Sequence, residues 1–181
     1  MTAMQRVYVI GASGAGKTTL ARRLSRQLGV PHVELDALYW GPNWTPPGVE
    51  EFQARVAQAL AGDAWVVDGN YSRVRDLILP HADTVVWLDC PLSVVLWRLV
   101  RRTFRRVWTR EVLWNGSCET LGGVLFSRDS LILWTLQTYR RRRRDYAALF
   151  HQPDSGHRTW VRLTSSKAVE HWLSSTKDGD I

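Results

Sequence analysis

The sequence predicts an α/β fold in three layers, in which a parallel β-sheet is covered by helices on both faces. Five short apolar runs alternate with segments of helical periodicity, and this alternation is typical of parallel sheets that are buried on both sides. The runs cover residues 6–10, 32–35, 65–67, 84–88 and 159–163. A glycine-rich stretch between the first run and the first helical segment supports the same class. The 181 residues are enough for one domain with a single core.

Five helical segments can be placed around these runs. They cover residues 17–27, 50–60, 91–108, 129–150 and 167–173. The first ends at Gly29 and Pro31, which stop a helix, and the last is expected to be capped by Ser165 or Ser166. The stretch 109–128 has mixed periodicity and predicts no regular element.

The glycine-rich stretch, residues 11–18, reads Gly-Ala-Ser-Gly-Ala-Gly-Lys-Thr and matches the P-loop pattern G-x-x-x-x-G-K-[ST] without a mismatch. The backbone N–H groups of such a loop, together with the positive end of the following helix, surround phosphate oxygens. Lys17 is expected to reach the β- and γ-phosphates, and Thr18 to offer its hydroxyl to Mg²⁺. The chain is therefore expected to bind ATP, or another nucleoside triphosphate, through Gly11, Ala12, Ser13, Gly14, Ala15, Gly16, Lys17, Thr18 and Thr19.

The chain is basic, and its charge is unevenly distributed. The net charge is +7, with 21 arginines against 3 lysines, and 12 of the 24 basic residues lie between Arg98 and Arg144. Because arginine binds phosphate through two hydrogen bonds at once, this region predicts either a lid over phosphates or a nucleic-acid surface. The five arginines at 140–144 would wrap more than a full helical turn, which argues against a single nucleic-acid face.

Several other classes are excluded by composition. No signal peptide is expected, because nothing at the start of the sequence resembles one. No membrane-spanning segment is expected either, since the best apolar candidate, residues 85–100, is interrupted by charged residues and a proline. Cys90 and Cys118 form neither a disulfide framework nor a metal pattern, and the five histidines have no ligand spacing. A cytoplasmic protein without a membrane partner is expected.

Three aspartates follow predicted strands: Asp36, Asp68 and Asp89. In open parallel sheets, ligands bind beyond the carboxyl ends of the strands, so these carboxylates should surround the phosphate site. Asp68 is expected to act on the Mg²⁺ side, with a turn residue before Gly69 as the alternative. Asp36 is expected to contact the acceptor or the metal, unless it caps a helix. Asp89 precedes Cys-Pro and is expected to be structural.

Four arginines near the end of the 91–108 segment could contact phosphate: Arg101, Arg102, Arg105 and Arg106. Arginines that close over a transferred phosphoryl group stabilise its negative charge, and Arg101 and Arg105 are assigned this catalytic role. The alternative for each of the four is a solvated helix face.

An aromatic turn at residues 39–44 follows the second strand. Its rings could stack on a nucleobase at the mouth of an acceptor site, or they could pack the turn onto the core. Arg73 could likewise bind an acceptor or a γ-phosphate, or it could pair with Asp76.

Four strings occur in an order that resembles the adenylate-kinase-like small P-loop kinases: the P-loop, then residues 35–40, 67–72 and 87–89, before an arginine-rich helix. More narrowly, Leu35-Asp36-Ala37-Leu38-Tyr39-Trp40 and Asp68-Gly69-Asn70-Tyr71 resemble bacterial proteins labelled DNA topology modulation protein or adenylate kinase-related ATPase. The resemblance covers about residues 5–175. It implies a five-stranded parallel sheet in the order 2-3-1-4-5, an acceptor-binding segment after the second strand and an arginine-rich helical lid after the fourth.

The chain departs from true adenylate kinases in two places. There the Asp-Gly pair continues to Pro-Arg, whereas here Asp68-Gly69 continues to Asn70-Tyr71, which argues against AMP as the acceptor. The lid also lacks a four-cysteine zinc pattern, so no zinc is expected.

Together these observations predict a single P-loop kinase-like domain over residues 1–181. Its core would cover about 5–95 and 150–175, its acceptor-side segment about 37–62 and its lid about 100–148. The predicted activity is Mg²⁺-dependent transfer of phosphate from ATP to a nucleotide, a nucleoside or another small molecule. The predicted catalytic residues are Lys17, Asp36, Arg101 and Arg105, and the predicted Mg²⁺ ligands are Thr18 and Asp68.

Two alternatives stay open. The first is a nucleotide-switched ATPase that binds nucleic acid through the basic region, and the second is a regulatory NTPase without an acceptor. No pattern in the sequence identifies the acceptor, separates ATP from GTP or gives the oligomeric state.

Overall fold

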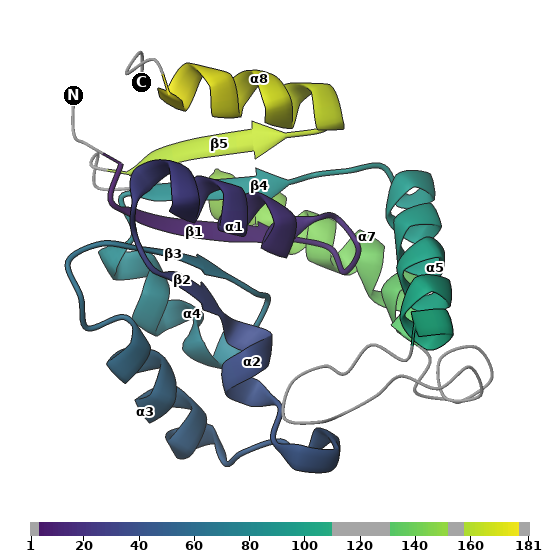
Figure 1. Ribbon diagram of the computed structural model, residues 1–181, viewed down its shortest axis with the longest axis horizontal. Helices are drawn as coiled ribbons and strands as arrows, with labels where there is room; N and C mark the ends of the chain where they lie inside the picture. Colours follow the sequence, from purple (N-terminus) through teal and green to yellow (C-terminus); the bar gives the residue numbers. More distant parts are fainter. Residues whose placement is uncertain (1–3, 110–130, 152–157, 178–181) are drawn as a thin grey trace.

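A five-stranded parallel sheet forms the centre of the molecule, with its strands in the order β2-β3-β1-β4-β5 (Figure 1). The computed structural model describes residues 4–109, 131–151 and 158–177. The strands are β1 (Arg6–Gly11), β2 (His32–Glu34), β3 (Trp65–Asp68), β4 (Thr84–Leu88) and β5 (Thr159–Leu163). The predicted α/β class and the predicted strand order are both confirmed.

Helices alternate with these strands along the chain. They are α1 (Lys17–Leu28), α2 (Leu35–Tyr39), α3 (Val49–Ala59), α4 (Ser72–Ile78), α5 (Leu92–Thr109), α7 (Leu131–Phe150) and α8 (Ser166–Lys177), with two 3₁₀ helices, η1 (Pro42–Trp44) and η2 (Leu79–His81). Each of the five predicted helical segments corresponds to one of them, whereas periodicity does not predict α2 and α4. Among the described helices, none has both the length and the apolar character needed to cross a membrane.

One sequence prediction concerns the start of the last helix, and another concerns the stretch without a predicted element. Ser165 caps α8, because its Oγ accepts a hydrogen bond from the Ala168 N–H at 3.2 Å, and it was one of two predicted caps. No regular element is predicted for residues 109–128, and the predicted lid covers about 100–148. Residues 110–130, which overlap both stretches, lie outside the part of the chain that the structure describes.

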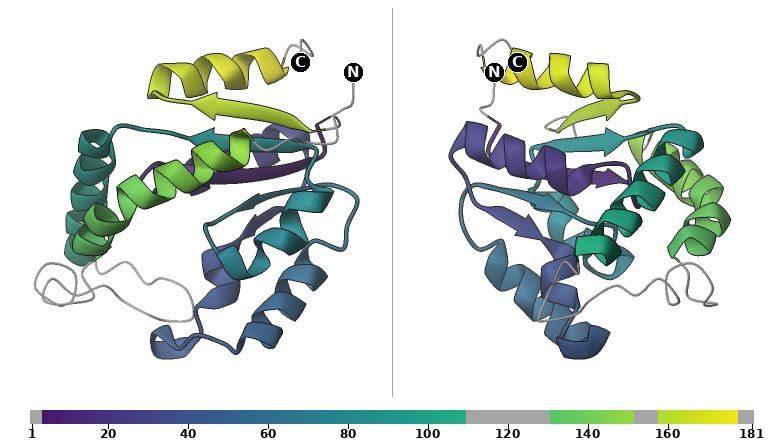
Figure 2. Two further views of the ribbon diagram at one scale, coloured as in Figure 1. Left: turned by 180° about the vertical axis from the view of Figure 1, so that it is seen from behind. Right: turned by 45° about the vertical axis from the view of Figure 1, so that its right-hand side comes forward.

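Alternating side chains of β1 divide the core between the two faces of the sheet. Val7 and Val9 point to one face, where α1 and α8 cover them with residues such as Leu24. Tyr8 points to the other face and joins a cluster that contains Phe52 of α3 together with residues of α4 and α7. Figure 2 shows α7 lying across this second face, with α5 beyond the carboxyl ends of the strands. The carboxyl edge of the sheet is therefore the side where loops from several strands meet.

Asp89 lies just past β4 and joins it to two other elements through ion pairs. Its carboxylate is buried and accepts hydrogen bonds from Arg143 of α7 at 2.7 Å and from Arg162 of β5 at 3.0 Å. Burial by itself would raise the pKa of Asp89, but the two guanidinium groups outweigh it and hold the pKa below its ordinary value. Asp89 thus has the structural place that its sequence context predicts.

The other arginines of the 140–144 run point in several directions. Arg142 lies over the ring of Trp134, with its guanidinium carbon 4.3 Å from the ring centroid. Arg140, Arg141 and Arg144 are exposed. Arg143, in contrast, is bound to Asp89. The five arginines therefore do not share one face of the helix, which is what their wrap around more than a full helical turn predicts.

Replacing Asp89 with Asn should remove the charge that both arginines bind while keeping the shape of the side chain. We expect the free energy of unfolding at pH 7 to fall by about 2 kcal/mol. Because the folded-state pKa of Asp89 is depressed, its contribution is complete above the unfolded pKa of about 3.9 and is lost as the pH falls through the folded value. Urea unfolding of parent and variant at pH 7 and near pH 3 should show a gap that narrows at the lower pH.

Glu170→Gln provides the matched control, because Glu170 is exposed and pairs with Arg23 at the surface. Its urea midpoint should barely move. An equally small effect of Asp89→Asn would contradict the structural role of Asp89.

Candidate active site

The P-loop joins β1 to α1 at the carboxyl edge of the sheet. It turns back where the Ala15 N–H donates to the Ala12 carbonyl at 3.1 Å, and α1 begins at Lys17. Gly14 has a φ of +81°, and a Cβ at this position would lie 2.8 Å from the Val95 carbonyl oxygen. Only glycine fits there, so α5 packs directly on the loop.

Lys17 folds over the P-loop with its ammonium group near several charges. Its Nζ donates to the Ala12 carbonyl at 3.1 Å. Burial lowers the pKa of Lys17, Asp68 and Asp36 act to raise it, and Arg102 adds to the lowering. Carboxylates from β3 and from α2 therefore lie close enough to Lys17 to influence its charge.

Glu34 is a site residue that sequence reasoning missed. It ends β2, and its carboxylate accepts hydrogen bonds from Thr18 Oγ1 at the long distance of 3.5 Å and from Arg22 at 3.2 Å. Burial raises the pKa of Glu34, and the neighbouring carboxylates of Asp68 and Asp36 raise it further, against the opposing effect of Arg22. Its position at the end of the second strand, two residues before Asp36, is the sequence feature that could have identified Glu34 as a site residue.

Asp68, the last residue of β3, has a buried carboxylate oxygen without a hydrogen bond in the described structure. Its Oδ2 forms no hydrogen bond with the described residues, and His32 Nε2 lies 3.7 Å away. Since buried carboxylate oxygens are rarely left unsatisfied, this oxygen suits a hydrated cation. Together with Thr18 and Glu34 it provides the oxygen donors that Mg²⁺ prefers.

A metal at this edge would need ligands from the nucleotide as well. Within the described ranges, no group of three or more His, Cys, Asp or Glu side chains is arranged to hold a metal ion. Mg²⁺ in nucleotide sites is commonly bound by one or two protein groups, phosphate oxygens and water. The residues present therefore fit an ion that arrives with the nucleotide.

The turn after β3 holds the P-loop and the acceptor side together. The Gly11 N–H donates to Asn70 Oδ1 at 3.3 Å, and Asn70 Nδ2 donates back to the Gly11 carbonyl. Gly69 has a φ of +141°, and a Cβ there would lie 2.6 Å from Leu35 Cβ. Because Leu35 is the first residue of α2, this turn determines where α2 begins, and with it Asp36.

Asp36 lies in the first turn of α2, two residues beyond the end of β2. Tyr71 donates its hydroxyl to Asp36 Oδ1 at 2.6 Å. Burial raises the pKa of Tyr71, and the charge of Asp36 raises it further, so the phenol stays protonated. The Tyr39 ring packs 4.6 Å from Tyr71, 4.9 Å from Trp40 and 5.0 Å from the buried Phe52. The aromatic turn is thus attached to the core, as one of its two predicted roles requires.

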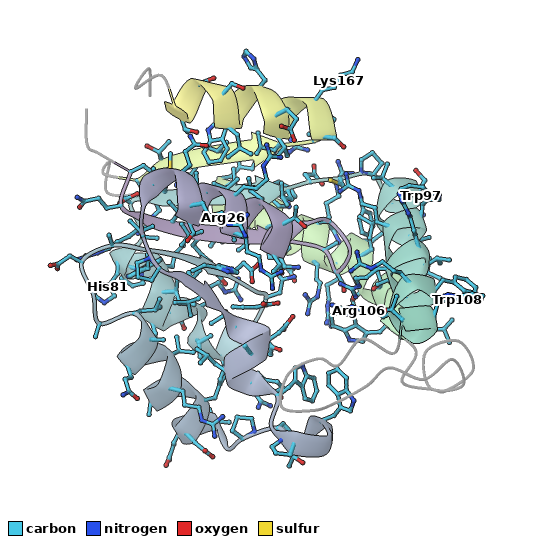
Figure 3. All side chains as sticks on the ribbon, viewed as in Figure 1. Arg26, His81, Trp97, Arg106, Trp108 and Lys167 are labelled. Atoms are coloured by element: carbon cyan, nitrogen blue, oxygen red, sulfur yellow. The ribbon has the colours of Figure 1, made fainter. Side chains whose placement is uncertain are left out.

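One face of α5 points toward the P-loop. Arg98 Nη1 donates to the Ala15 carbonyl at 2.7 Å, and its Nη2 donates to Ser166 Oγ at 2.9 Å. Arg102 and Arg106 follow at intervals of four residues on the same face. Figure 3 shows Arg106 on the inner side of α5.

The structure does not bring Arg101 and Arg105, the two predicted catalytic arginines, to this face. Both are exposed, and the Arg101 guanidinium lies over the ring of Trp97, 5.3 Å from its centroid. Trp97 points outward from α5 in Figure 3. Successive residues of a helix are rotated by about 100°, so Arg101 and Arg105 point in a different direction from Arg102 and Arg106. The second pair shares the face that is turned toward the P-loop.

Comparison with known proteins identifies the family. A family model described as AAA domain matches residues 7–177. The chain belongs to this AAA domain family. Nearly the whole described structure is therefore a P-loop domain of a family whose members bind nucleoside triphosphates.

Its curated relatives include small-molecule kinases. A shikimate kinase of Thermosynechococcus vestitus is 30% identical over 139 residues, which cover 69% of this chain and 74% of that protein. An adenylate kinase of Gloeobacter violaceus is 28% identical over 129 residues, covering 55% of this chain and 59% of the kinase. The uncharacterized protein YqaC of Bacillus subtilis is 32% identical over 113 residues, which span 61% of this chain and only 63% of YqaC. The chain is thus related to the small-molecule P-loop kinases, and none of these relatives is named for topology modulation.

Solved structures show the same fold. The shikimate kinase from Acinetobacter baumannii in complex with shikimate superposes with a TM-score of 0.61 at 18% identity, covering 95% of this chain and 90% of the other. A gluconokinase from Sinorhizobium meliloti 1021 gives a TM-score of 0.53 at 18% identity, with 99% and 93% covered. At this level of identity the likeness establishes the P-loop kinase fold and not the substrate.

Replacing Gly69 with Ala should displace α2 from the turn after β3. The new Cβ would meet Leu35, and the positive φ is strained for any residue with a side chain, so we expect a loss of about 3 kcal/mol in the free energy of unfolding. Urea unfolding measures this loss. Gly48→Ala is the matched control, because Gly48 has a φ of −59° and open space around its Cβ position. Equal stability of the two variants would contradict the proposed contact between Gly69 and Leu35.

Proposed function

We propose that this protein is a Mg²⁺-dependent phosphotransferase that moves the γ-phosphoryl group of ATP to a hydroxyl group of a small molecule. One observation carries the proposal: Lys17 of the P-loop and the carboxylate of Asp36 lie within electrostatic reach of each other at one edge of the sheet. A phosphate held by the loop would therefore lie beside a carboxylate able to accept the proton of an attacking hydroxyl. The kinase names of several relatives support the same class.

The roles of the remaining residues follow from their places. The loop amides and Lys17 would hold the β- and γ-phosphates, and Asp36 would orient the acceptor hydroxyl. We propose that Arg102 and Arg106, which share the face of Arg98, stabilise the charge of the transferred group in place of Arg101 and Arg105.

Mg²⁺ would be held by the Thr18 hydroxyl and, through water, by Asp68. When bound, the ion would neutralise negative charge on the phosphates as the phosphoryl group moves. Glu34, which already accepts a hydrogen bond from Thr18, would keep that hydroxyl in place.

Replacing Lys17 with Ala should abolish phosphate transfer, because the β- and γ-phosphates lose the cation that orients them. We expect kcat to fall by about 10²-fold or more. Transfer from labelled ATP is measured with Mg²⁺ against a panel of nucleosides, nucleoside monophosphates and small hydroxyl compounds. Lys167→Ala is the matched control, since Lys167 lies on α8 and its side chain points outward from the molecule (Figure 3). A parent protein that releases only free phosphate with every acceptor would instead support a regulatory NTPase.

Nucleic-acid binding is a second candidate, favoured by the exposed arginines of α5 and α7. These are Arg101, Arg105, Arg140, Arg141 and Arg144. If they only solvate the helices, mobility shifts of labelled DNA or RNA should vanish near physiological salt, because binding through phosphates alone weakens steeply with salt. A complex that persists at about 0.15 M salt, and that weakens in Arg140→Ala, Arg141→Ala and Arg144→Ala variants, would favour this candidate.

A further inference from the structure

We propose that the acceptor is an uncharged alcohol that carries a flat ring, in the chemical class of a nucleoside, and not a phosphate ester or a carboxylic acid. The inference rests on the proposed function, because it names the substrate class of the same site. Three features of the acceptor side support it: a braced carboxylate, an aromatic surface with a strained tryptophan, and a group of neighbouring carboxylates.

The Asp36 carboxylate is braced by a chain of hydrogen bonds. Tyr71 donates to Asp36 Oδ1 at 2.6 Å, and the Trp40 side chain is hydrogen-bonded to Tyr71. The indole N–H can only donate, so the single phenolic proton of Tyr71 is committed to Asp36. Within the described residues, no hydrogen bond reaches the other oxygen, Oδ2. Asp36 is therefore fixed in orientation and presents one acceptor oxygen, which matches one neutral hydroxyl donor.

The aromatic surface beside Asp36 includes a tryptophan in a strained conformation. Tyr39, Trp40, Trp44 and Tyr71 are all partly exposed, and Trp40 and Trp44 meet edge to face with ring centroids 5.6 Å apart. Trp44 has a φ of +60°, and it is the one described residue other than glycine with a positive φ. A large side chain rarely adopts this conformation.

The turn that contains Trp44 explains how the strain is held. The Gly41 N–H donates to the Thr45 carbonyl at 2.9 Å, and the Thr45 N–H donates to the Pro42 carbonyl at 3.2 Å. Glycine would satisfy the backbone of this turn without strain. Strained residues of this kind gather at ligand clamps. An aromatic ring placed in this way offers a flat partner an apolar contact or a stack.

The charges on this side disfavour an anionic acceptor. Asp36 and Asp68 both lie close enough to Glu34 to raise the pKa of its carboxyl, so three carboxylates gather at this edge. A phosphate or carboxylate bound beside Asp36 would be repelled by this group. Arg55 is the one basic residue in 37–62, and its guanidinium is committed to the Leu38 carbonyl at 3.0 Å and to Glu51.

The transfer step balances without any further reactant. The acceptor oxygen forms a bond to the γ-phosphorus, and the bond from this phosphorus to the β,γ-bridging oxygen breaks. ADP leaves with that electron pair, the proton of the acceptor hydroxyl passes to Asp36 Oδ2, and the product is a phosphate monoester of the alcohol.

An acceptor panel with matched pairs tests the charge preference. Each nucleoside is compared with its own 5′-monophosphate, and shikimate serves as a ring alcohol with a carboxylate, all with Mg²⁺ and ATP. We expect kcat/KM for the best nucleoside to exceed that for its monophosphate and for shikimate by at least about 10-fold, which corresponds to about 1.4 kcal/mol. Preference for a charged acceptor would overturn this inference and leave the proposed function standing.

Two further arms separate the remaining outcomes. Arg73, exposed at the start of α4, is a basic residue for which the sequence suggests an anion contact on the acceptor. If the parent protein prefers charged acceptors and Arg73→Ala does not, Arg73 binds the anionic group and the inference is overturned. Transfer to no member of the panel, although ATP binds, would overturn both the inference and the proposed function. In contrast, nucleoside transfer that is unchanged in Arg73→Ala is the result we expect.

Trp44→Gly tests the aromatic surface without straining the fold. The substitution removes the indole and its contact with Trp40 but relieves the strain of the positive φ, so the thermal midpoint should change little. We expect the acceptor KM to rise by about 10-fold or more while the KM for ATP stays constant. Trp97→Ala, on the outer face of α5, is the matched control and should change neither KM. An unchanged acceptor KM in Trp44→Gly would overturn the proposed aromatic contact.

Discussion

Two hydrogen bonds between the side-chain amide of Asn70 and the backbone of Gly11 connect the two halves of the site. The amide accepts from the Gly11 N–H and donates to the Gly11 carbonyl, so it pairs with the loop much as a neighbouring strand would. The residue before it, Gly69, contacts Leu35 at the start of α2. The residue after it, Tyr71, holds Asp36. Three consecutive residues therefore set the distance between the phosphate loop and the acceptor side.

The parts of the fold that could be predicted from sequence are those with a local, repeated signal. The central strands β1, β3 and β4 are apolar runs because both faces of the sheet are covered there, and the long helices show an apolar stripe. The P-loop is readable because each of its positions needs a particular residue type. By contrast, α2 and α4 contain five and seven residues, too few for periodicity to distinguish a helix from a loop.

The acceptor side could be predicted only in part, because its contacts join residues that are far apart in the chain. Asp36 stands out by following a strand, but its partner Tyr71 lies 35 positions later. Glu34 belongs to the site through Thr18, sixteen positions earlier. The arginines of α5 are also determined by contacts that the sequence does not reveal. Their spacing defines two helix faces, 98-102-106 and 101-105. Only the contact of Arg98 with the P-loop shows that the first face points inward.

The two halves of the site depend on different kinds of order. The phosphate side is built from backbone groups and one lysine, and Arg98 fixes it from outside by binding the Ala15 carbonyl. The acceptor side is built from side chains, with Asp36, Tyr71 and Trp40 linked in a row. Backbone geometry tolerates few changes, whereas side chains can be exchanged singly without moving the sheet. If the proposed function holds, the side chains of α2, of η1 and of the turn after β3 would select the acceptor, while the P-loop would serve any acceptor alike.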